Sequence, residues 1–163
     1  MEYADGLVFM SPSPSTVHQQ VSGRLHAKLF NFLDGGKCQV FSAPYDIHLY
    51  RDDLDETKIF IPDLSVICDQ DGLKENRFVG VPELISEILS PSNQSHDLVT
   101  KMEAYMKYGV KEYWVVTPML NAIQLYALTG EQVYQQIEVM KDKGTIKSSI
   151  LKGFQVHLEE IFR

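Results

Sequence analysis

The sequence predicts an α/β fold built as one domain over residues 1–163, in the order helix, three strands, helix, strand and then an antiparallel extension. Three observations support this order. An apolar stripe at helical spacing follows residue 16, several short apolar runs are typical of strands, and residues 84–118 read as a strand–helix–strand unit. Such a unit forms a right-handed parallel crossover. A chain of 163 residues is also long enough to bury a sizeable core.

The first helix is expected to begin after Pro14, because a proline followed by Ser15 or Thr16 is typical of a helix start. The apolar residues then recur every three or four positions, and the sequence "DGG" at 34–36 is expected to end the helix. The stripe consists of Val17, Val21, Leu25, Leu29, Phe32 and Leu33.

The strands of the first half are read from apolar runs between polar loops. Residues 37–50 contain two strand-like runs that are interrupted near Pro44, because proline cannot donate a hydrogen bond to a neighbouring strand. Residues 58–68 form the next strand, residues 69–82 a loop with one short turn, and residues 84–90 another strand.

The second half begins with a helix whose buried face carries Leu98, Met102, Tyr105 and Met106 and which ends at Gly109. Residues 111–118 are apolar on both faces, as a central parallel strand requires. Residues 122–128, 132–140 and 154–158 alternate like antiparallel strands, with a hairpin turn at 129–130 and a final helical turn at 158–163.

The composition limits the compartment and the partners. No apolar run approaches the roughly 18 residues that cross a bilayer, and the first ten residues lack the basic and apolar segments of a secretory signal. A cytoplasmic protein without a membrane partner is therefore expected. Its two cysteines, Cys38 and Cys68, show no metal-binding spacing and are expected to be buried thiols.

The net charge of −7 argues against a non-specific binder of polyanions but leaves room for a local basic patch. Candidate phosphate contacts are Lys74, Arg77 and Lys107.

Two carboxylates interrupt apolar runs. Asp63 lies in "FIPDLSVI" and Glu87 in "LISEILS". If these runs are neighbouring strands, the two acids can face the same side, where their charges would repel. A divalent cation relieves this repulsion, and hard oxygen ligands suit Mg²⁺ or Mn²⁺. Without metal, Glu87→Gln is expected to raise the melting temperature.

Lys101 borders the buried face of the second helix and can reach towards the strand ends. Beside a metal-bound phosphate, a lysine can steady the attacking water or the developing charge. Other interpretations remain open: Asp63 can cap a turn, Glu87 can form a structural ion pair, and Asp97 with Lys101 can form a surface salt bridge. His18 on the first helix can serve packing alone.

The segments "PDLSVI", "ELISEILSPS" and "HDLVTKMEAYMKYGVKEYWVV" resemble the Uma-two family of putative restriction endonucleases, of the PD-(D/E)XK nuclease superfamily. The resemblance runs from about residue 11 to residue 118. It implies a restriction-endonuclease-like core of helix, three strands, helix and strand, with the C-terminal antiparallel extension beyond it.

Carried over residue by residue, the resemblance matches Asp63 to the aspartate of the "PD" motif and Glu87 to the second acid. Leu89 stands where the superfamily has its lysine, and the family's lysine falls on Lys101 in the following helix. Thr117 stands where relatives commonly carry an aspartate.

The resemblance implies a metal-dependent endonuclease that hydrolyses the phosphodiester bonds of nucleic acid, with Mg²⁺ or Mn²⁺ as cofactor and DNA as the expected partner. Asp63, Glu87 and Lys101 would be catalytic, and the main-chain carbonyl of Ile88 would complete the metal ligands. His18 and Asp97 are expected in the outer shell of the site.

Two alternatives remain at this stage: a catalytically inactive binding module on the same fold, and a metal site acting on a small phosphorylated molecule. A homodimer is expected as well, because two cuts in a duplex are most simply made by two sites related by a two-fold axis.

Overall fold

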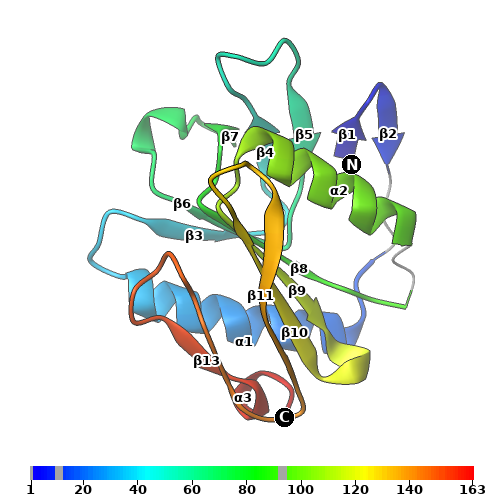
Figure 1. Ribbon diagram of the computed structural model, residues 1–163, viewed down its shortest axis with the longest axis vertical. Helices are drawn as coiled ribbons and strands as arrows, with labels where there is room; N and C mark the ends of the chain where they lie inside the picture. Colours follow the sequence, from blue (N-terminus) through cyan, green and yellow to red (C-terminus); the bar gives the residue numbers. More distant parts are fainter. Residues whose placement is uncertain (1, 10–12, 92–94) are drawn as a thin grey trace.

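The computed structural model describes residues 2–9, 13–91 and 95–163, and the side chains of residues 2, 9 and 95–97 lie outside this description. Its centre is a six-stranded sheet in the order β11-β10-β9-β8-β6-β3 (Figure 1). Along the chain these strands are β3 (Gln39–Ser42), β6 (Leu64–Ile67), β8 (Leu84–Ile88), β9 (Glu112–Thr117), β10 (Ala122–Leu128) and β11 (Tyr134–Lys141).

Helix α1 (Thr16–Leu33) follows the predicted signals at both ends. The side chain of Ser15 accepts a hydrogen bond from the backbone N–H of His18 and so caps the helix start. After Asp34, Gly35 adopts a positive φ of 81°, a conformation that glycine tolerates well. Val21, Leu25 and Leu29 are buried, which confirms the apolar stripe.

Helix α2 (Ser95–Tyr108) connects β8 to β9, and these two strands pair in parallel with Leu84 opposite Glu112. The predicted strand–helix–strand unit with parallel strands is therefore confirmed. Gly109, with a φ of 93°, ends the helix and donates its N–H to the carbonyl of Tyr105.

A second sheet has the order β2-β1-β5-β4-β7. The expectation of a loop over residues 69–82 was wrong, because β7 (Arg77–Gly80) pairs in parallel with β4 (Asp46–Leu49). The predicted strand over 58–68 is divided at Pro62, so that its halves join different sheets. The other strands of this second sheet are β1 (Glu2–Ala4), β2 (Leu7–Phe9) and β5 (Lys58–Phe60), and the turn η1 spans Gln70–Gly72.

The C-terminal extension continues beyond β9 through the turn η2 (Pro118–Leu120) to the hairpin β10–β11. The last segment adds β12 (Thr145–Lys147), β13 (Gln155–His157) and the short helix α3 (Leu158–Ile161). Strands β12 and β13 pair with each other.

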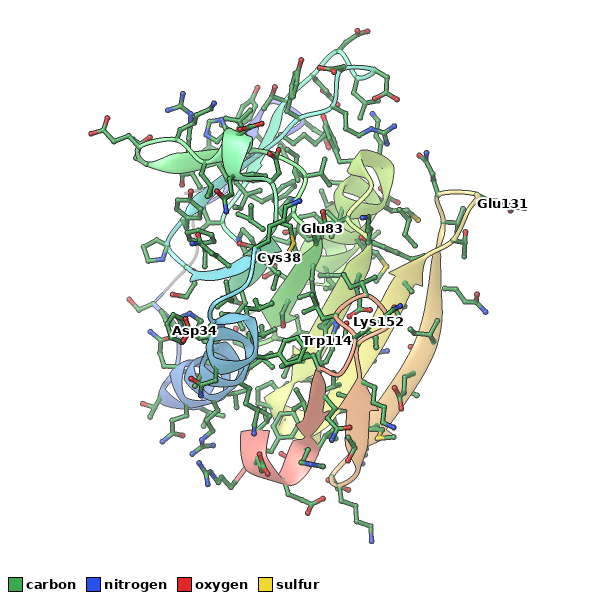
Figure 2. The ribbon with its side chains drawn as sticks, turned by 90° about the vertical axis from the view of Figure 1, so that its left-hand side faces the viewer. Asp34, Cys38, Glu83, Trp114, Glu131 and Lys152 are labelled. Atoms are coloured by element: carbon green, nitrogen blue, oxygen red, sulfur yellow. A yellow bond between two sulfur atoms is a disulfide. The ribbon has the colours of Figure 1, made fainter. Side chains whose placement is uncertain are left out.

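The cores on the two faces of the central sheet differ in their elements. On one face, α1 and the C-terminal segment pack against side chains that include Trp114 of β9 (Figure 2). On the other face, α2 and the second sheet bury a set that includes Tyr105 and Tyr113. In the part of the chain that is described, no helix combines the length and the apolar character needed to span a membrane.

The expectation of two free thiols was wrong. Cys38 and Cys68 form a disulfide, and their Cα atoms lie 4.1 Å apart. The register of β3 and β6 explains the pairing, because Gln39 lies opposite Ile67 and the two cysteines are the next facing pair. Figure 2 shows Cys38 at this end of the sheet.

Candidate active site

Asp63 lies at the bend between β5 and β6, directly after Pro62. Its carbonyl accepts a hydrogen bond from the N–H of Ala43, which holds the backbone at the end of the sheet. Its side chain turns towards β8, where Oδ2 accepts a hydrogen bond from the N–H of Ile88 at 2.8 Å. The carboxylate thus lies across the carboxyl end of β8.

Glu87 is buried on β8, with only 4% of its surface exposed. Since side chains alternate along a strand, Glu87 points to the same face as Ile85, towards α2. There the hydroxyl of Tyr105 donates a hydrogen bond to Oε1 at 2.9 Å, and Lys101 Nζ lies 3.7 Å from the same oxygen. Burial of an ionised carboxylate is costly, and the hydrogen bond from Tyr105 and the charge of Lys101 offset the cost.

The register brings the two acids together. Leu64 pairs with Ser86 in the antiparallel β6–β8 ladder, so the next facing positions are Asp63 and Glu87. Facing residues of an antiparallel pair have Cβ atoms about 5 Å apart. The two apolar runs that contain the acids are therefore neighbouring strands, as the sequence-based argument required, with Asp63 directly before β6 and Glu87 on β8.

Lys101 and Tyr105 come from successive turns of α2. Because they are four positions apart, they share one face of the helix. Lys101 is buried, with 8% of its surface exposed. The structure therefore brings together Asp63, Glu87 and Lys101, the three residues that the sequence singled out, although their catalytic roles stay predictions.

His18, in the first turn of α1, faces Asp63 from the opposite layer. Its Nε2 lies 3.2 Å from Asp63 Oδ1. The hydrogen bond with Asp63 is the main cause that raises the pKa of His18, and burial acts in the opposite direction. The Nδ1 atom is buried and finds no hydrogen-bond partner among the described residues. Both carboxylate oxygens of Asp63 are thus engaged by neighbouring groups.

The oxygen atoms at this point suit a hard divalent cation. The N–H of Ile88 points to Asp63, and its carbonyl lies on the same side of β8, since both groups of one strand residue face the same way. Among the described residues, no three His, Cys, Asp or Glu side chains are grouped to hold a metal. Mg²⁺ needs fewer, because it usually keeps several waters and takes one or two carboxylates together with substrate phosphates.

The predicted phosphate contacts lie elsewhere. The side chain of Asp97 is outside the described residues. Lys74 donates to the carbonyl of Asp71, and Arg77 lies on β7 of the second sheet. Lys107 follows Lys101 by six residues on α2, and its Nζ lies 3.8 Å from Glu56 Oε1. The fold therefore does not place these three basic side chains around Asp63 and Glu87.

Tyr105 was not predicted as a partner of Glu87. This tyrosine was expected on the apolar face of the helix, and its ring is indeed fully buried. A signal was present, because Tyr105 follows Lys101 by one helical turn.

The pattern of the family described as "Uma2: Putative restriction endonuclease" matches residues 1–159. The chain belongs to the Uma2 family. A curated relative from Synechocystis sp. (strain ATCC 27184 / PCC 6803 / Kazusa), named uncharacterized protein slr1290, is 31% identical over 126 residues. That alignment covers 77% of this chain and 64% of the relative, so the chain spans less than two thirds of the length of that protein.

A solved structure from Anabaena variabilis ATCC 29413, described as a putative nuclease belonging to DUF820, is similar in fold with a TM-score of 0.79. The similarity covers 99% of this chain and 88% of the other, at 16% sequence identity. The restriction-endonuclease-like core predicted from the Uma2 resemblance is thereby confirmed.

Proposed function

We propose that this Uma2 protein is a metal-dependent endonuclease that hydrolyses phosphodiester bonds of DNA. One observation carries the proposal: a buried glutamate, a facing aspartate and a buried lysine converge at the carboxyl end of β8. Glu87 Oε1 lies 3.7 Å from Lys101 Nζ, and Asp63 Oδ2 accepts a hydrogen bond from the N–H of Ile88, the residue that follows Glu87. Family membership supports a nuclease as the general class.

Asp63, Glu87 and the carbonyl of Ile88 would hold the cation, because they offer only oxygen atoms from two adjacent strands. When bound, Mg²⁺ or Mn²⁺ activates a water molecule and neutralises charge on the phosphate. His18 holds one oxygen of Asp63 and the N–H of Ile88 holds the other, which fixes the plane of this carboxylate.

Lys101 is the group of the chain that would act on the substrate. Its ammonium lies on the same side of Glu87 as α2, and its burial strengthens its electrostatic effect compared with a lysine in water. In this role it orients the attacking water or stabilises the charge that develops on the phosphate.

The decisive experiment is cleavage of plasmid and single-stranded DNA with Mg²⁺, with Mn²⁺ and with EDTA. Lys101→Met should lower the cleavage rate at least a hundredfold, because removing one preorganised charge donor typically costs that much. Lys107→Met is the matched control, since this lysine lies on the same helix with half of its side chain exposed and pairs with Glu56. Equal rates for both variants would contradict the proposal.

A binding module without catalysis is the second candidate, and a specific contact favours it. Glu87 already has the charge of Lys101 and the hydroxyl of Tyr105 as partners, so a purely structural pair would need no cation. Binding of DNA with no cleavage under any metal condition, and equal binding by Asp63→Asn, would support this candidate.

A further inference from the structure

Tyr105 is the least accessible of the groups that contact Glu87. Its surface is fully buried, and its hydroxyl lies 2.9 Å from Glu87 Oε1. A phenol at neutral pH is protonated, so it donates this hydrogen bond and the carboxylate accepts it. Hydrogen bonds with one charged partner are shorter and stronger than those between neutral groups.

Aromatic packing fixes the position of this hydroxyl. The ring of Tyr105 makes edge contacts with Phe60 at 5.4 Å and with Tyr113 at 5.3 Å between centroids. Phe60 comes from the second sheet and Tyr113 from β9, so the ring is held between α2 and two other elements. These ring contacts therefore hold the hydroxyl towards Glu87.

Lys101 approaches the same oxygen, Oε1, at 3.7 Å. One hydrogen bond from Tyr105 and the charge of Lys101, from successive turns of α2, thus act on one atom of Glu87 and restrict the rotation of its carboxylate. A carboxylate that binds a metal needs such restriction, since the groups that contact the ligands of a metal orient these ligands and tune the affinity for the metal.

We propose that Tyr105 is a positioning residue that orients the Glu87 carboxylate for a divalent cation. This inference rests on the proposed function. The proposed role depends on the hydroxyl of Tyr105, whereas a packing role depends on its ring. A phenylalanine at this position would fill the same space and lose only the hydroxyl, so this substitution separates the two roles.

The chain offers a matched control in the same aromatic cluster. Tyr134 stacks with Tyr113 at 6.1 Å, and its hydroxyl donates to the carbonyl of Val110 at 2.7 Å. Tyr134→Phe therefore also removes one hydroxyl and one hydrogen bond, but this bond is made to the backbone after α2 rather than to a proposed ligand.

The experiment compares Mn²⁺ binding to wild type, Tyr105→Phe and Tyr134→Phe, measured by calorimetry or electron paramagnetic resonance without DNA. Tyr105→Phe should weaken Mn²⁺ binding about tenfold or more, and Tyr134→Phe should remain within twofold of wild type. Melting curves of both variants establish that they are folded. In a Glu87→Gln background, Tyr105→Phe should cause no further loss, because the carboxylate that it orients is absent.

Mn²⁺ affinity of Tyr105→Phe within twofold of wild type would overturn the inference, and so would equal losses in both tyrosine variants. Wild type that binds Mn²⁺ but cleaves no DNA would contradict the proposed function, while the role of Tyr105 would still be decided by the affinities. Wild type that binds no Mn²⁺ would overturn both.

Discussion

Replacing Glu87 with glutamine removes the charge that Lys101 faces in the layer between α2 and the central sheet. From the sequence alone, Glu87 faces another acid, and the substitution is expected to stabilise the metal-free protein. The contacts reverse this expectation. Both Glu87 and Lys101 are more than nine-tenths buried, so the substitution leaves a buried ammonium without this counter-charge.

The size of the effect follows from the distance. Two unit charges 3.7 Å apart attract by about 4 kcal/mol at an effective dielectric constant of about 20. Glutamine keeps an oxygen that can accept the hydrogen bond from Tyr105, and repulsion from Asp63 is relieved. We therefore expect a net loss of about 2 kcal/mol in EDTA. For a chain of this length, that lowers the melting temperature by about 4–8 °C.

Added Mg²⁺ separates the two variants further. A cation at one hundred times its dissociation constant stabilises the folded wild type by about 2.7 kcal/mol, whereas Glu87→Gln should gain little because it lacks a ligand. Thermal melts of both proteins, in EDTA and in Mg²⁺, measure this difference. Glu83→Gln is the control, since Glu83 (Figure 2) directly precedes the same strand. Its side chain pairs with the exposed Lys111. Glu83→Gln should change stability by at most about 1 kcal/mol and leave the response to Mg²⁺ intact.

Two results would refute this reasoning. If Glu87→Gln melts at or above the wild-type temperature in EDTA, repulsion from Asp63 outweighs the attraction of Lys101. If both proteins gain equally from Mg²⁺, Glu87 is not a metal ligand, and the pair with Lys101 serves structure alone.

Three further predictions concern stability and assembly. Ser86→Ala should raise the free energy of unfolding by about 1 kcal/mol in urea titrations, because the buried hydroxyl has no hydrogen-bond partner among the described residues; a loss of stability would show that a partner exists. Burial is the main cause that lowers the pKa of His48, so its pKa in the folded protein lies below its pKa in the unfolded chain. The stability that neutral His48 contributes is therefore lost as the pH falls from the unfolded pKa to the folded pKa. Wild type should therefore lose more stability than His48→Gln between pH 8 and pH 5, and equal losses would contradict this. Light scattering at micromolar concentration should give the mass of a homodimer, because β11 ends the sheet and exposes Val133, Ile137 and Val139 nearby; a monomer mass would remove the argument for paired cuts.

The elements that the sequence predicted correctly are those encoded by local patterns. The stripe of α1, its cap at Ser15 and its end at Gly35 are all read within about twenty residues. The crossover from β8 through α2 to β9 is similarly local, because its apolar strands and helical spacing follow one another along the chain.

The errors concern pairing between distant segments. Strand β7 pairs with β4 across about thirty residues, and its sequence "RFVG" is too short to show an alternation. The disulfide depends on the register of β3 with β6, which places Cys38 opposite Cys68. Neither the partner of a strand nor its register is fixed by the composition of that strand alone.

The candidate site lies between these two cases. Asp63 and Glu87 could be selected from the sequence because an ionised carboxylate in an apolar run carries a cost that something else must offset. The identity of the compensating groups was only partly accessible. Lys101 was found through its helical spacing, and His18 was expected in the outer shell of the site, with packing as the alternative. Tyr105 was assigned to packing, since its contact with Glu87 depends on how α2 lies on the sheet.

A structural ion pair and a metal site share the contacts around Glu87, and they differ in what a cation does to them. In an ion pair, Lys101 is the sole charge that Glu87 requires, so an added cation competes with it and gives no stability. In a metal site, the cation would neutralise the charges of both acids, so that the ammonium of Lys101 would be available to the phosphate of the substrate. The position of Asp63 favours the second arrangement, because its carboxylate is held beside Glu87 by the N–H of Ile88, where a lone ion pair would have no need of a second acid.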